Sequence, residues 1–146
     1  MRGYRNKILD YYSAEVAAFT PIERVFLARR PGSSRLYNQH DIQELACRHG
    51  FEAVFTEDLT FGQQVALFFH AKYIVGPTGA AFSGLIFATE RLRALRLLGV
   101  SEKYENYFSN LATVGGAQIL DCNSDTPKHQ LGPLEFQIPQ QRFEQR

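Results

Sequence analysis

The sequence lacks the features that mark several large classes of protein. It has only two cysteines, Cys47 and Cys122, with no C-x-x-C pair and no histidine at ligand spacing, so neither a disulfide framework nor a zinc site is indicated. A net charge of +1 gives no support for bulk attraction to nucleic acid or to a membrane surface. No apolar run approaches the roughly 20 residues that a transmembrane helix needs, and the polar start of the chain has no signal-peptide core. We therefore expect a cytoplasmic domain with no membrane segment and no nucleic-acid partner.

What is present suits one packed domain. The chain has 146 residues, of which 45% are hydrophobic, and this is enough for a single core. Regular patterning runs from residue 1 to residue 123, which we take as the domain. Residues 124–146 hold three of the six prolines and several glutamines, so we expect a loosely packed tail with a short strand at Leu134–Ile138.

Short apolar runs alternate with stretches of helical periodicity five times along the chain. Because parallel strands need crossover connections, which are usually helices, this order favours a parallel sheet. The fold class expected is α/β, a Rossmann-like parallel sheet of about five strands with helices on both faces. The first helix is expected at residues 4–19, and the strands at residues 24–28, 51–55, 73–75, 94–98 and 117–121.

Two helix ends carry recognisable signals. Thr60 and Gln63 match a capping box, in which each side chain satisfies a free backbone donor of the other residue. Gly50 follows a helical stripe at the position where a glycine commonly ends a helix, and Asn38 or Asp41 offers the N-cap of that helix.

The glycine-rich turn after the third strand is the most informative stretch. Gly76, Thr78, Gly79 and Ala80 lie between a buried strand and an apolar helix. Such a turn leaves backbone N–H groups unpaired at a helix start, where the helix dipole also favours an anion such as a diphosphate. The alternative is that the glycines merely permit a tight turn. The turn is neither a G-x-G-x-x-G fingerprint nor a Walker A loop.

A second group of candidate residues follows the first strand. Arg29, Arg30 and Arg35 flank the turn at residues 31–34, and Asn38 comes shortly after. Guanidinium groups match phosphate geometry with paired, charge-assisted hydrogen bonds. Because this loop leaves the same edge of the predicted sheet as the glycine-rich turn, both groups can face one diphosphate. The alternative is a solvated loop in which the arginines only aid solubility.

Acid–base machinery is not recognisable in the sequence. The four histidines are scattered, and the adjacent acids Glu57 and Asp58 are explained by an N-terminal acidic turn. Arg91 and Arg93 are expected on the surface. No catalytic residue can be named, and no metal site or bound cofactor is expected.

Two segments together resemble family 61 glycosyltransferases. The first resembles the family's pattern of a strand, Arg-Arg, a turn and Arg-x-x-Asn. The second resembles the family signature, which usually reads Gly-x-His-Gly-Ala. The similarity extends over residues 24–122. The first segment is Arg24-Val-Phe-Leu-Ala-Arg-Arg-Pro-Gly-Ser-Ser-Arg-Leu-Tyr-Asn38, followed by the similar stretch Leu45…His49-Gly50-Phe51-Glu52. The second is Gln64-Val65-x-Leu67-Phe68-x-x-Ala71-x-x-Ile74-Val75-Gly76-Pro77-Thr78-Gly79-Ala80.

The resemblance implies one half of a GT-B-like enzyme, the C-terminal half that holds a nucleotide-sugar donor. A complete enzyme would need an N-terminal domain or a partner chain, and would transfer a hexosyl or pentosyl group to a hydroxyl acceptor. Bacterial members are associated with surface polysaccharide synthesis. By the resemblance, the donor diphosphate is held by Arg29, Arg35, Asn38, Gly76, Thr78, Gly79 and Ala80.

Three residues depart from the family pattern. Thr78 replaces the usual histidine, Gly84 replaces a common asparagine, and Arg96 lies near a position that is often a glutamate suited to binding ribose. These departures favour an alternative function, a non-catalytic, degenerate transferase domain that acts as a binding or interaction module. A Rossmann-like oxidoreductase is less well supported, because the dinucleotide fingerprint is absent.

Overall fold

The protein is an α/β domain built on a five-stranded parallel sheet. The computed structural model describes residues 2–30, 37–98, 107–124 and 138–139. The strand order is β2-β1-β3-β4-β5, and every neighbouring pair is parallel. The predicted Rossmann-like α/β class is therefore confirmed. The strands are β1 (Arg24–Leu27), β2 (Glu52–Val54), β3 (Tyr73–Pro77), β4 (Arg93–Leu98) and β5 (Gln118–Asn123).

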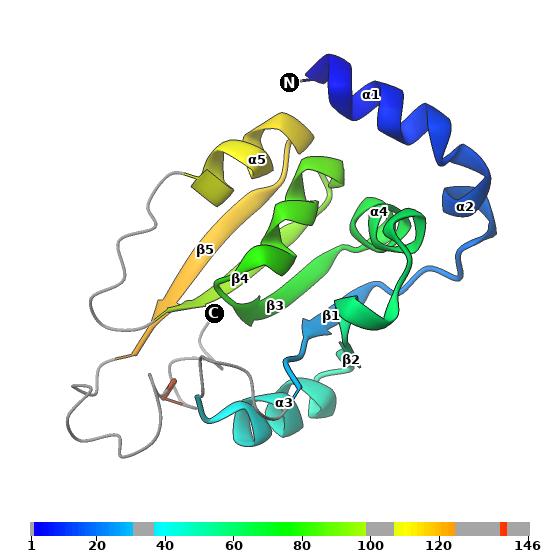
Figure 1. Ribbon diagram of the computed structural model, residues 1–146. Coiled ribbons are helices and arrows are strands. Elements are labelled where there is room, and N and C mark those ends of the chain that lie inside the picture. The colour runs from blue at the N-terminus through cyan, green and yellow to red at the C-terminus, as the bar shows by residue number, and fades with distance from the viewer. Residues whose placement is uncertain (1, 31–36, 99–106, 125–137, 140–146) are drawn as a thin grey trace.

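Helices lie on both faces of the sheet, but unevenly. Within the described residues, α3 covers one face beside β1 and β2, while α4, η2 and α5 cover the other (Figure 1). Helices α1 and α2 lie outside this second layer, against η2 and α4. The α-helices are α1 (Arg2–Tyr11), α2 (Ser13–Ala18), α3 (Gln39–Arg48), α4 (Phe61–His70) and α5 (Tyr107–Gly115), and the 3-10 helices are η1 (Thr56–Asp58) and η2 (Ala80–Phe87).

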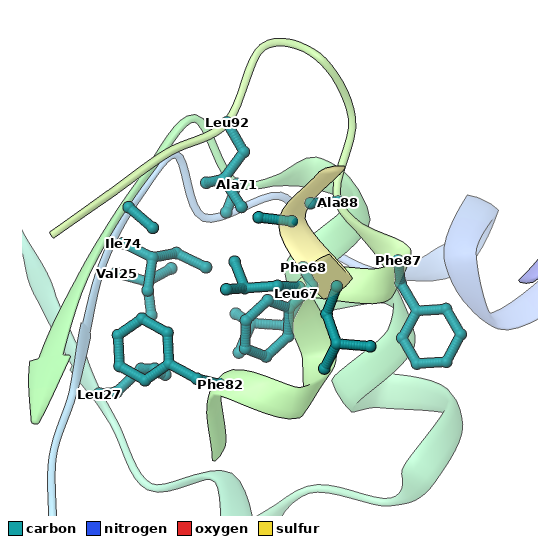
Figure 2. Close-up of a cluster of buried hydrophobic side chains, with 14 of the residues drawn as sticks. Val25, Leu27, Leu67, Phe68, Ala71, Ile74, Phe82, Phe87, Ala88 and Leu92 are labelled. Atoms are coloured by element: carbon teal, nitrogen blue, oxygen red, sulfur yellow. The ribbon is translucent and has the colours of Figure 1, made fainter. Parts of the chain in front are cut away.

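The core forms two apolar clusters because side chains alternate along each strand. In β1, Val25 and Leu27 point to the face of α4 and η2, and Phe26 points to the face of α3. The larger cluster fills the space between β1, β3, α4 and η2 (Figure 2). The smaller cluster includes Ile138, which is 1% exposed and lies with Leu97 and Cys122 on the α3 face.

Both predicted helix-end signals are confirmed. The Thr60 hydroxyl accepts from the Gln63 amide at 3.2 Å, and the Gln63 side chain accepts from the Thr60 amide at 2.9 Å. Gly50 ends α3 with a φ of +83°, a left-handed conformation that glycine adopts without a side-chain clash. Asn38 occupies the N-cap position of α3, although its side chain makes no capping bond.

The prediction of one helix over residues 4–19 is wrong in one respect. The structure has two helices, α1 and α2, that meet at Tyr12. The break allows α2 to pack on α4 while α1 continues to the end of η2. There the Arg5 guanidinium donates to the carbonyls of Ile86 and Ala88 at 2.9 and 2.8 Å. These carbonyls lie at the C-terminal end of η2, where the helix dipole favours a cation.

Other boundaries differ from those expected. Strand β3 runs to Pro77, two residues beyond the predicted end, because Gly76 and Pro77 continue the pairing with β4. The helix that follows is a 3-10 helix. The predicted strand at Leu134–Ile138 lies outside the described residues except for Ile138, which is in no strand.

Gly84 is required by close packing of η2 against α4. A Cβ atom at Gly84 would lie 2.3 Å from two ring carbons of Phe68, a buried side chain of α4. The family's common asparagine therefore does not fit here unless Phe68 moves.

We expect Gly84→Asn to lower the free energy of unfolding by about 1–3 kcal/mol, the usual cost of overpacking a core. Gly3→Asn is the matched control, because a Cβ at Gly3 would meet nothing within 4 Å. Urea denaturation of both variants measures the difference. Equal stability of the two variants would show that the Phe68 ring moves aside at little energetic cost.

Candidate functional site

The strand order reverses direction between β1 and β3. From β1 the chain moves outward to β2, and from β3 it moves the other way through β4 to β5. In open parallel sheets, ligands bind at such a switch point, beyond the carboxyl ends of the strands. The two loops that leave this point begin after Leu27 and after Pro77, so Arg29 of the first candidate group and the glycine-rich turn both lie here.

The turn after β3 presents backbone donors at the start of η2. The Thr78 amide donates to the Leu97 carbonyl at 3.0 Å, and the Phe82 amide donates to the Gly79 carbonyl at 3.0 Å. Between these two bonds, the amides of Gly79, Ala80 and Ala81 donate to no carbonyl in the part of the chain that the structure describes. Such groups at a helix start carry partial positive charge and attract anions.

The Arg29 guanidinium lies directly against this turn. Its Nη2 atom donates to the Thr78 carbonyl oxygen. A Cβ atom at Gly79 would lie 2.7 Å from the same nitrogen, so the side chain passes over the glycine at the N-cap of η2. The cation that follows β1 and the donors that follow β3 therefore lie side by side.

Gln39 fixes the backbone of Arg29. Its side-chain amide donates to the Arg29 carbonyl and accepts from the Arg29 amide, each at 2.8 Å. The first residue of α3 thus holds the loop that carries the guanidinium. Sequence reasoning missed Gln39, and the only signal was a second side-chain amide next to Asn38 at the helix start.

Tyr37 lies near Arg29 and Arg30 follows it, and the electrostatic surroundings of these two neighbours differ. Burial raises the pKa of the Tyr37 hydroxyl well above its usual range, and the Arg29 charge opposes part of that rise. Arg30 instead faces acids, because Glu57 lies 3.4 Å away and Asp58 accepts from its Nη2. Of the two adjacent arginines, Arg29 therefore faces the turn and Arg30 forms an exposed ion-pair network after β2.

The remaining expected site residues have different surroundings. Asn38 donates to the Ile138 carbonyl at 2.9 Å and accepts from the Ile138 amide at 2.8 Å. Gly76 is buried within β3, where a Cβ would lie 2.7 Å from the Leu27 Cβ. Thr78 is 1% exposed, Gly79 and Ala80 lie nearer the surface, and Arg35 falls outside the described residues.

Two further properties concern the described residues only. They contain no group of three or more histidine, cysteine, aspartate or glutamate side chains able to hold a metal ion. None of their helices combines the length and apolar character needed to cross a bilayer. Arg91 and Arg93 are exposed, as predicted, whereas Arg96 is buried.

The parallel sheet defines a Rossmann-like domain, and at its switch point the Arg29 guanidinium lies against the turn after β3. The chain belongs to the Glycosyltransferase 61 family, whose model matches residues 2–95 of the 146. The resemblance found in the sequence is confirmed, and the match also takes in α1 and α2. No curated protein matches the chain significantly.

We expect Gln39→Ala to destabilise the protein by about 1–3 kcal/mol, because the half-buried amide and carbonyl of Arg29 would lose their hydrogen-bond partner. Gln43→Ala is the matched control on the same helix, since no hydrogen bond of the Gln43 side chain occurs among the described residues. Chemical denaturation measures both. A cost no larger at position 39 than at position 43 would contradict the role given to Gln39.

Proposed function

We propose that this domain binds the diphosphate of a nucleotide-sugar donor at the switch point between β1 and β3, for transfer of the sugar to a hydroxyl acceptor. The observation that carries the proposal is the contact of the Arg29 guanidinium with the Thr78–Gly79 turn. Membership of a glycosyltransferase family supports transfer as the reaction. The positive edge supports an anionic group as the part of the donor that it holds.

The arrangement suits a reaction that releases a diphosphate. As the bond to the sugar breaks, negative charge grows on the leaving phosphate oxygens, and fixed donors around them lower the barrier. Arg29 supplies a full positive charge, and the amides that follow Thr78 supply partial charges. These groups stabilise the leaving diphosphate by charge and by hydrogen bonding, and neither contribution depends on a proton transfer within this domain.

Two of the other expected site residues, Gly76 and Asn38, contribute by holding the backbone around Arg29 and the turn in place. Gly76 lets β3 approach Leu27 closely, and Asn38 fixes the start of α3, which holds Arg29 through Gln39. Arg35 belongs to the loop between Arg29 and Asn38, and we assign its guanidinium to the same diphosphate. The general base and the acceptor site would come from a second domain or a partner chain, as in a GT-B enzyme. Surface polysaccharide synthesis in the cytoplasm is the process we propose.

A non-catalytic binding module is the second candidate. Threonine stands at position 78, where the resemblance to the family implies histidine, and it supplies no cation to a leaving group. A domain of this kind would retain the diphosphate site and lack turnover even when its partner is supplied. Binding and turnover therefore need separate measurement.

We expect calorimetric titration with UDP, GDP and CMP to reveal binding of a nucleoside diphosphate, and Arg29→Ala to weaken it about tenfold or more, the value of a charge-assisted hydrogen bond. Arg91→Ala is the matched control, because Arg91 is an exposed arginine that precedes β4, at the amino ends of the strands and away from the candidate site. An equal loss of nucleotide affinity in both variants would mean that Arg29 acts only through the net charge of the protein. No binding at millimolar nucleotide would overturn the proposal.

We expect Gly79→Val to weaken nucleotide binding while the free energy of unfolding changes little. A Cβ at position 79 would displace the Arg29 guanidinium, which is the flexible end of its side chain and can move without disturbing the core. Gly3→Val in exposed α1 is the control for both measurements. Unchanged affinity in Gly79→Val would mean that the phosphate does not lie against this turn.

A further inference from the structure

A bidentate ion pair joins β4 and β5 near the carboxyl edge of the sheet. Arg96 donates from Nε to Asp121 Oδ1 at 2.8 Å and from Nη2 to Oδ2 at 3.0 Å. The Arg96 side chain is 3% exposed, whereas that of Asp121 is 41% exposed. The guanidinium is therefore inside the protein, and the carboxylate that it holds reaches the surface.

The pair lies on the face of η2 and level with the end of β3. Arg96 is paired in the sheet with Gly76 on one side and with Asp121 on the other. Leu95 and Leu97 belong to the cluster beneath α3, so Arg96 points to the opposite face, the one that η2 covers. Because adjacent strands are about 4.8 Å apart, the Asp121 and Gly76 Cα atoms are separated by roughly 10 Å across the sheet.

The burial of Arg96 has a consequence for the carboxylate. A buried guanidinium is costly unless it is paired, so Arg96 holds Asp121 in one orientation. Each carboxylate oxygen accepts one N–H from Arg96 and has a further lone-pair direction. Asp121 therefore offers two fixed acceptors on its exposed side, beside the edge where the diphosphate is proposed to bind.

We infer that the Asp121 carboxylate accepts hydrogen bonds from the ribose hydroxyls of the bound nucleotide, with Arg96 as its positioning residue. This inference rests on the proposed diphosphate site. The ribose ring is joined to the α-phosphate only through C5′ and its ester oxygen, so the sugar must lie beside the diphosphate along the edge. Carboxylates commonly bind ribose hydroxyls in nucleotide sites of parallel sheets.

The assignment also gives the nucleotide a direction along the edge. The carboxylate repels phosphate, so the phosphates stay at Arg29 and the ribose extends over β4 toward β5. Family membership does not supply this residue, because the family match ends at residue 95.

The test compares each of UDP, GDP and CDP with its 2′-deoxy and 3′-deoxy counterparts by calorimetry. We expect the wild-type protein to bind the ribose form about tenfold more tightly than a deoxy form. Asp121→Ala should remove this preference by lowering the affinity for the ribose form to the deoxy level. Asp58→Ala is the control, an exposed, ion-paired carboxylate that follows β2 at the same edge, and it should keep the preference.

A second variant guards against misfolding, because Asp121→Ala leaves Arg96 buried without its carboxylate. In the double variant Arg96→Met with Asp121→Leu, apolar side chains of similar size replace the pair, a change that is often neutral for stability. It should also bind ribose and deoxy forms equally. If the ribose preference survives in this variant, the role of Asp121 is overturned while the diphosphate site stands. If the wild-type protein binds no nucleotide, the diphosphate proposal fails, and this inference fails with it.

Discussion

The candidate site depends on one contact between the ends of two strands that are distant in sequence. Arg29 follows β1, and the turn it touches follows β3, some fifty residues later. The contact exists because the two strands are parallel neighbours with their carboxyl ends side by side. Gly76 makes the approach close enough, since a side chain there would collide with Leu27. Charge and backbone donors are thus combined by packing, without any single motif that contains both.

Much of the fold could be predicted because it follows from local patterns. The capping box at Thr60 and Gln63, the glycine at position 50 and the alternation of strands with helices each have a short-range physical cause. The candidate site was less predictable. The strand order, the burial of Arg96 and the bond from Asn38 to Ile138 depend on residues that are far apart, so no spacing in the sequence reveals them. The break at Tyr12 was hidden for the same reason, because its cause is packing against other helices.

Two departures from the family pattern have local structural partners. Gly84 accompanies the Phe68 ring, which occupies the space that a side chain at position 84 would need. Arg96 accompanies Asp121, which neutralises it from the neighbouring strand. Each unusual residue therefore belongs to a pair that packs or balances charge, and such residues do not by themselves indicate a decayed site. Nothing in the structure explains the threonine at position 78.

The two-way hydrogen bond between Asn38 and Ile138 spans 100 positions of the chain. During synthesis it cannot form until Ile138 has left the ribosome, and Ile138 follows the last residue of β5, Asn123, in the chain. Contacts of such separation are slow to close, because the entropy of the intervening loop must first be overcome. The start of α3, and with it the loop that positions Arg29, is therefore expected to reach its final order at the end of folding. A nascent chain would therefore have all the residues of its sheet before the start of α3 could be anchored by this bond.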